Sequence, residues 1–87
     1  MGMIEPIPGV TSIRRIVRDG IVVAILRMLE HGGTTTVVAE LFTEGPNGPQ
    51  SAGERPYHFV ARDEAEAFVD DTLGTFTYLG CEIESAA

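Results

Sequence analysis

Residues 10–29 read VTSIRRIVRDGIVVAILRML, and they carry the clearest structural signal in the chain. Two runs rich in β-branched residues, 10–18 and 21–29, flank the dipeptide Asp19-Gly20. Asp-Gly between two such runs is the strongest short signal for a β-hairpin, because both central residues of a type I′ turn need positive φ. The stretch therefore predicts two antiparallel strands joined by a two-residue loop.

A second turn signal extends this hairpin into a meander. Gly32-Gly33 precedes residues 34–43, which form another β-rich run. Two-residue loops also fix the strand register. We therefore expect these opposite pairs: Arg18 and Ile21, Val17 and Val22, Arg15 and Ala24, Ile13 and Leu26, Met28 and Val37, Leu26 and Ala39, Ala24 and Leu41.

The expected register sorts the three strands into two faces, because side chains alternate along a strand. The expected core face carries Ile13, Val17, Val22, Ala24, Leu26, Met28, Val37, Ala39 and Leu41, with Arg15 and Thr43 as polar members. The expected opposite face carries Arg14, Arg18, Arg27, Glu40 and Glu44, interleaved with Ile16, Ile21, Val23, Ile25, Val38 and Phe42. That face is mixed in composition. It carries more apolar residues than a solvated sheet face and more charged residues than a face covered by another layer.

The second half of the chain begins with a segment poor in large apolar residues. Residues 45–56 hold three Pro and three Gly, which predicts a flexible loop. Plain connector is the simpler role for this loop, and a partner-binding or lid element is the alternative. Residues 57–60 are aromatic and β-branched, which predicts a fourth strand.

A helix over residues 64–79 is the next expectation. Asp63 and Glu66 hold the N-cap and capping-box positions, and Gly80 follows the apolar stripe where a left-handed C-cap ends a helix. A competing interpretation ends the helix at Gly74 and makes residues 75–84 a strand, because Gly inside a helix costs about 1 kcal/mol. A short edge strand at residues 81–83 fits both.

These elements predict one α+β domain over residues 1–87. Its architecture is an antiparallel β-meander of three to four strands, packed on one face by a single C-terminal helix, with room for a short final edge strand. Residues 1–9 predict an irregular lead-in. A domain of this size buries only about 60–65 % of the surface that its unfolded chain exposes, so a homodimer is the expected oligomeric state.

The charge and the cysteine content limit which cellular compartment and which classes of partner are expected for this chain. The formal charge is −7, with all six basic residues Arg, and this field repels phosphate backbones. Cys81 is the single cysteine, no Cys/His spacing resembles a zinc site, and residues 1–12 lack the features of a secretory signal. We expect a cytoplasmic protein without membrane contact, metal or cofactor.

Three arginines form the most distinctive constellation. Arg14, Arg18 and Arg27 share the mixed face in the expected register, near Glu40 and Phe42. Guanidinium groups flanked by apolar residues suit a carboxylate ligand, an acidic partner protein or a second copy of the chain. The simpler alternative is that Glu40 and Glu44 neutralise the arginines.

Other chemically capable residues favour simpler interpretations. His31 is interpreted as a turn residue, Cys81 as a small buried hydrophobic side chain, and Asp70-Asp71 as part of a solvated acidic face. Tyr57, His58 and Tyr78 are the candidates for a pocket between helix and sheet. We predict no catalytic residue.

The order of four strands and a helix resembles the PUR repeat, which implies single-stranded nucleic-acid binding, although the resemblance covers the element order alone and assigns no residue. A further alternative is single-stranded nucleic-acid binding through Arg14, Arg18 and Arg27. The acidic charge and the absence of Lys argue against that function. The leading hypothesis is a non-enzymatic, self-associating interaction or regulatory module that uses the arginine-bearing face. The alternative is a small-molecule-binding protein or cofactor-free enzyme.

Overall fold

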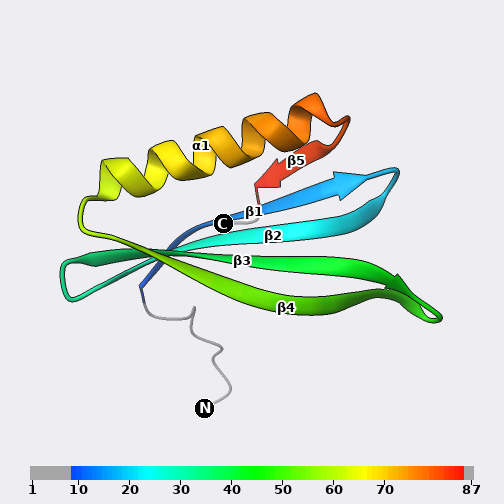
Figure 1. Ribbon diagram of the computed structural model, residues 1–87, viewed down its shortest axis with the longest axis horizontal. Helices are drawn as coiled ribbons and strands as arrows, with labels where there is room; N and C mark the ends of the chain where they lie inside the picture. Colours follow the sequence, from blue (N-terminus) through cyan, green and yellow to red (C-terminus); the bar gives the residue numbers. More distant parts are fainter. Residues whose placement is uncertain (1–8, 86–87) are drawn as a thin grey trace, which may run out of the picture.

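The computed structural model describes residues 9–85 and contains one sheet and one helix. The elements in chain order are β1 (Val10–Arg18), β2 (Ile21–His31), β3 (Thr34–Gly45), β4 (Gly48–Phe59), α1 (Arg62–Tyr78) and β5 (Glu82–Ser85). The antiparallel strands lie in the order β4-β3-β2-β1-β5, and α1 runs along one side of this sheet (Figure 1). The predicted α+β meander with one C-terminal helix is confirmed, and β5 is the short edge strand. The expected lead-in lies outside the described residues, apart from Gly9.

Both predicted turns are present. Asp19 and Gly20 have φ values of 52° and 79°, and Gly32 and Gly33 have values of 57° and 80°. Left-handed backbone at both loop positions is what a type I′ hairpin turn requires. The pairing of β2 with β3 matches the predicted register at all three positions, Met28/Val37, Leu26/Ala39 and Ala24/Leu41.

The predicted register of β1 is wrong beyond its first two pairs. Val17 pairs with Val22, but Ile16 then pairs with Ala24, so Val23 is an extra residue on β2. This β-bulge moves residues 12–16 of β1 to the other side of the sheet relative to our expectation, and a second irregularity at Thr11 returns Val10 to a position opposite Leu29. The predicted pairs Arg15/Ala24 and Ile13/Leu26 are replaced by Arg15/Ile25, Ile13/Arg27 and Arg14/Leu26.

The bulge changes which side chains reach the core. Ile16 is fully buried under the helix, and Val23 packs against the same core, although both were expected on the opposite face. Ile13 and Arg15 pair with residues of the opposite face instead. The buried core cluster consists of Ile16, Ala24, Leu26, Met28, Val37, Ala65 and Val69. The face of the sheet away from α1, which carries Ile13, Arg15, Ile25, Arg27, Leu29, Val38, Glu40 and Phe42, is hereafter the reverse face.

The expected loop at residues 45–56 is also wrong. Only Pro46 and Asn47 separate β3 from β4, and β4 pairs with β3 from Gly48 to Phe59. An edge strand tolerates Pro and Gly because one of its sides makes no ladder hydrogen bonds. A bulge at Ala52 interrupts the pairing, since Leu41 pairs with Gly53 while Phe42 pairs with Ser51.

The helix passes through Gly74 and ends at Tyr78, so the shorter alternative is wrong. Gly80 has a φ of 90°, and its N–H donates to the Thr77 carbonyl at 3.0 Å, which confirms the predicted left-handed stop. The predicted capping box is absent. The N-cap is Ala61, and Glu66 binds Arg62 at 3.3 Å instead.

Candidate binding groove

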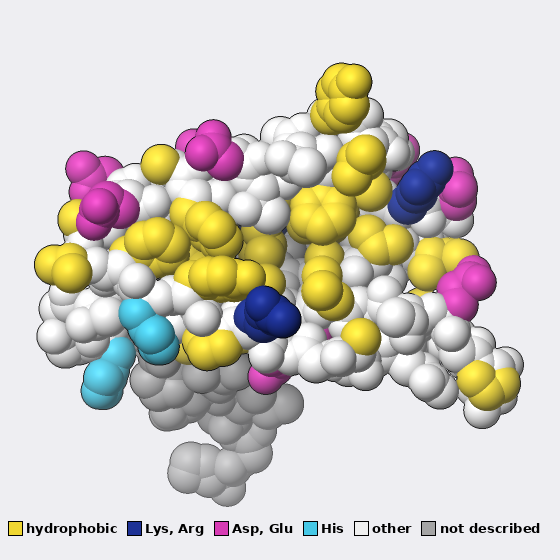
Figure 2. Space-filling model, in the orientation of Figure 1, with side chains coloured by type: hydrophobic (Ala, Val, Ile, Leu, Met, Phe, Trp, Pro, Cys, Tyr) yellow, Lys and Arg dark blue, Asp and Glu magenta, His cyan; other side chains and the backbone are white. Residues whose placement is uncertain are grey.

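The helix leaves part of its side of the sheet uncovered, and a groove runs between α1 and the β3–β4 ribbon. Its volume is about 430 Å³. Figure 2 shows hydrophobic side chains gathered in this region. We call it the α1–β4 groove; it is lined by Ala24, Leu26, Ala39, Leu41, Ala52, Gly53, Glu54, Arg55, Tyr57, Phe68, Thr72 and Phe76.

Strand alternation builds the sheet side of the groove. Leu26 and Ala39 face each other across β2 and β3, on the same side as Leu41 and Tyr57. Leu26 is buried, whereas Leu41 keeps 49 % of its surface exposed and Tyr57 keeps 36 %. The groove therefore has a buried floor and an apolar mouth that opens to solvent.

Aromatic rings form the wall next to the helix. The ring of Phe68 lies 4.8 Å from that of Tyr57 and 5.4 Å from that of Phe59, at interplanar angles of 40° and 42°. These tilted arrangements are ones that aromatic pairs prefer. Phe76 lines the groove two turns further along the helix. Phe68 and Phe76 are eight residues apart on α1, so helical spacing places both rings on the side of the helix that forms this wall.

One cationic side chain lines the groove. Arg55 lies opposite Ala39, and because it is two residues away from Tyr57 on β4, both side chains are on the same face of the strand. Glu54 also borders the groove, but its carboxylate is bound by Arg27 at 3.3 Å. The groove thus combines apolar walls with a single guanidinium group.

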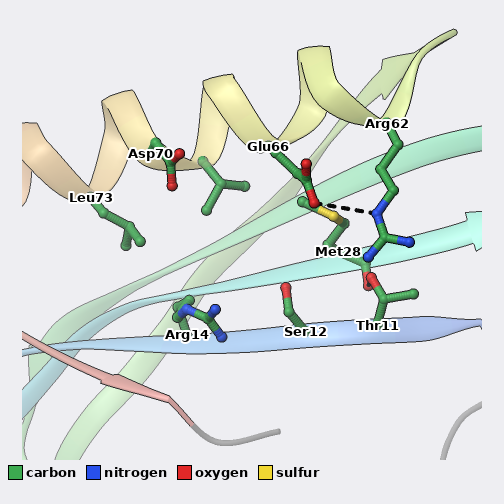
Figure 3. A pocket seen from close by; sticks show the side chains of 9 residues that line it. Thr11, Ser12, Arg14, Met28, Arg62, Glu66, Asp70 and Leu73 are labelled. Carbon is green, nitrogen blue, oxygen red and sulfur yellow. Dashed lines mark hydrogen bonds and ion pairs between the residues drawn. The ribbon is translucent and has the colours of Figure 1, made fainter.

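A second cleft lies on the other side of the helix and is polar. It has a volume of about 360 Å³, between α1 and the start of β1. Figure 3 shows Arg62 and Glu66 pointing toward one another at one end, with Arg14 and Asp70 further along. Arg62 also binds Glu30 at 3.2 Å, so its guanidinium group is shared by two carboxylates at this end of the cleft.

The three predicted arginines do not share a face. Arg14 and Arg18 are each two residues away from Ile16 on β1, so they share its face and lie on the helix side. Arg27 lies on the reverse face. The bulge at Val23 is the reason. It changes the pairing of β1 with β2, whereas the pairing of β2 with β3 stays as predicted. Arg27 is the one arginine of the three that stays with Glu40 and Phe42.

Arg27 is held by acidic side chains. Its Nη2 lies 2.9 Å from Glu40 Oε1, and its Nη1 lies 3.3 Å from Glu54 Oε2. Hydrogen bonds from the Ser51 hydroxyl and then from Arg27 lower the pKa of Glu40, against a smaller opposing effect of burial. The ion pair expected between Arg27 and Glu40 is therefore present, and Glu54, not Glu44, provides a second carboxylate.

The three predicted pocket residues are not brought together. Tyr57 lines the groove, but His58 points to the reverse face, where its Nδ1 lies 3.0 Å from Thr36 Oγ1. Tyr78 is 90 % exposed at the end of the helix. Sequence reasoning missed Leu41, which was expected inside the core, and Arg55, which was hidden inside the expected loop.

The described part of the chain shows little else with specific chemistry. His31 ends β2 beside the second turn, and Cys81 is partly buried against the core. Within residues 9–85, no three His, Cys, Asp or Glu side chains form a set that could hold a metal ion. The described helix is too short and too polar to cross a membrane.

Comparison with models of known families, with curated proteins and with solved structures found no match to this chain.

Proposed function

We propose that this chain is a binding module and that it takes a small apolar ligand in the α1–β4 groove. The observation that carries the proposal is the apolar mouth formed by Leu41 and Tyr57 over a floor of buried residues. Large apolar side chains are normally buried when a protein folds. A contiguous patch of such side chains that stays exposed to solvent therefore indicates a binding site. Here the alternation of β3 and β4 directs both side chains into one groove.

The size and lining of the groove support this function. Small-molecule sites have volumes of about 300–1,000 Å³, apolar and aromatic walls and few polar groups. The α1–β4 groove has a volume of about 430 Å³, with Phe68, Phe76 and Tyr57 as its aromatic residues. The second cleft is less suitable for an apolar ligand, because Arg62, Glu66 and Asp70 line it.

Titration with 1-octanol, followed by NMR chemical shifts, tests the proposal. We expect saturable shifts at Leu41, Tyr57 and Phe68, and an affinity several-fold lower in Leu41→Ser, because that variant loses apolar contact area. Leu79→Ser is the matched control, since Leu79 is exposed to a similar extent, 54 % against 49 %, but does not line the groove. Absence of binding, or equal weakening by both variants, would overturn the proposal.

A second candidate function, self-association, is favoured by the reverse face. Five half-buried apolar residues lie on it, and among residues 9–85 no second layer of helix or sheet covers them: Ile13, Ile25, Leu29, Val38 and Phe42. Five strands of about nine residues span roughly 24 by 30 Å. That area approaches the roughly 800 Å² per partner of a standard interface. A second copy of the chain is therefore the proposed occupant.

Sedimentation equilibrium at micromolar concentration tests self-association. We expect a dimer for the unmodified chain and a monomer for Val38→Glu, because a buried charge in each copy opposes stacking of the two faces. Val60→Glu is the matched control, since Val60 is 90 % exposed and follows β4 outside that face. Circular dichroism verifies that both variants are folded. A monomeric unmodified chain would refute the interface.

A further inference from the structure

Arg55 differs from Arg15 and Arg27, the two sheet arginines that form ion pairs. Arg15 binds Glu84 at 3.0 Å, and Arg27 binds Glu40 at 2.9 Å. Arg55 forms no ion pair within residues 9–85, although the chain carries thirteen acidic residues. Its neighbour Glu54 is engaged by Arg27. A guanidinium group without a carboxylate partner thus lies beside an apolar groove.

The chemistry of this pair of features indicates an anionic ligand with an apolar body. Guanidinium groups bind carboxylates through two parallel hydrogen bonds, and such charge-assisted bonds are stronger than neutral ones. A net charge of −7 repels a dianion such as a phosphate monoester more strongly than a monoanion. A monocarboxylate is therefore the anion that fits best.

We infer that the α1–β4 groove binds amphipathic monocarboxylates. The apolar body lies between Leu41 and Tyr57 on the sheet side and Phe68 and Phe76 on the helix side, and the carboxylate is bound by Arg55. This inference rests on the proposed function, because it requires that the groove accept an apolar ligand. It adds the charge and the orientation of that ligand.

Arg14 provides an internal comparison. It also lies on the helix side of the sheet, and it forms no ion pair among the described residues. It lines the second cleft, however, together with Glu66 and Asp70, whose carboxylates oppose the entry of an anion. Arg14→Gln therefore removes the same charge from the molecule without changing the α1–β4 groove.

The experiment compares octanoate with 1-octanol by NMR titration at neutral pH and low ionic strength. We expect octanoate to bind about fivefold more tightly than 1-octanol, as an ion pair at a solvent-accessible site allows. Arg55→Gln should weaken octanoate binding about fivefold and 1-octanol binding much less, so that the preference is lost, because Gln removes the charge but keeps part of the side-chain stem. Arg14→Gln should keep the preference. Added salt should reduce it.

Three results would overturn the inference. If Arg55→Gln binds octanoate as tightly as the unmodified chain, or if Arg14→Gln loses the preference equally, the carboxylate does not contact Arg55. In both cases continued binding of 1-octanol leaves the proposed function intact. If neither ligand binds the unmodified chain, the proposed function and this inference are both wrong.

Discussion

At the residue scale, Arg27 explains how two glutamates lie side by side on the reverse face. Glu40 on β3 pairs directly with Glu54 on β4, and like charges at opposite positions destabilise a sheet. Arg27 on β2 reaches both carboxylates, at 2.9 and 3.3 Å. The Arg27 guanidinium group thus reduces the repulsion between the carboxylates of Glu40 and Glu54. Hydrogen bonds from the Ser51 hydroxyl and from Arg27 also lower the pKa of Glu40.

The lowered pKa of Glu40 predicts a specific dependence of stability on pH. Because the folded-state pKa lies below the ordinary value of 4.5, Glu40 stabilises the folded chain above that value, and this contribution is lost as the pH falls through the folded-state pKa. Urea unfolding between neutral and strongly acidic pH should therefore show a smaller loss of stability in Glu40→Gln than in the unmodified chain.

A matched substitution on the same strand separates this effect from general acid unfolding. Glu44 also lies on β3, and it forms no ion pair among the residues that the structure describes. Glu44→Gln should follow the unmodified chain. If Glu40→Gln loses stability on acidification as steeply as Glu44→Gln does, the interactions of Glu40 with Ser51 and Arg27 do not contribute to stability.

At the element scale, the bulge at Val23 decides which side of β1 enters the core. Without it, the two-residue turn would place Ile13 under the helix and Ile16 on the reverse face. With it, Ile16 pairs with Ala24 and Ile83 and is fully buried, while Ile13 pairs with Arg27 and stays half-buried. The turn residues Asp19 and Gly20 do not predict the extra residue Val23 on β2.

Alanine substitutions at these two positions test the bulged register. Ile16→Ala should lower the free energy of unfolding by about 2–5 kcal/mol, because it leaves a cavity in the core. Ile13→Ala should cost clearly less, since that side chain keeps contact with solvent. Urea denaturation monitored by circular dichroism measures both. An Ile13→Ala variant that loses as much stability as Ile16→Ala would contradict the register.

The β3–β4 hairpin shows that composition alone does not predict this strand. The Pro and Gly content of residues 45–56 predicts a loop, but most of these residues belong to β4. The pairing comes from β3, whose outer edge would otherwise be open, and not from the intrinsic preference of residues 48–56. This misassignment also hid Arg55, which becomes a groove residue only when β4 alternates beside β3.

At the scale of the whole molecule, the small size of the chain explains why a groove is present. One helix of 17 residues must cover the helix side of a five-stranded sheet. It buries Ala65 and Val69 over the middle strands, and the β3–β4 ribbon extends beyond it (Figure 1). Leu41 and Tyr57 remain exposed there because no further helix follows within residues 9–85.

Local sequence patterns account for the meander, both glycine-containing turns, the pairing of β2 with β3 and the helix that ends before Gly80. These features follow from local preferences for positive φ and from the periodicity of apolar residues, which neighbouring residues alone express. Long-range contacts in the folded chain produce the bulge at Val23, the strand formed by residues 48–59 and the position of Arg55 beside the groove. Each of these depends on hydrogen bonding or packing with a strand that is distant in the sequence or displaced in register.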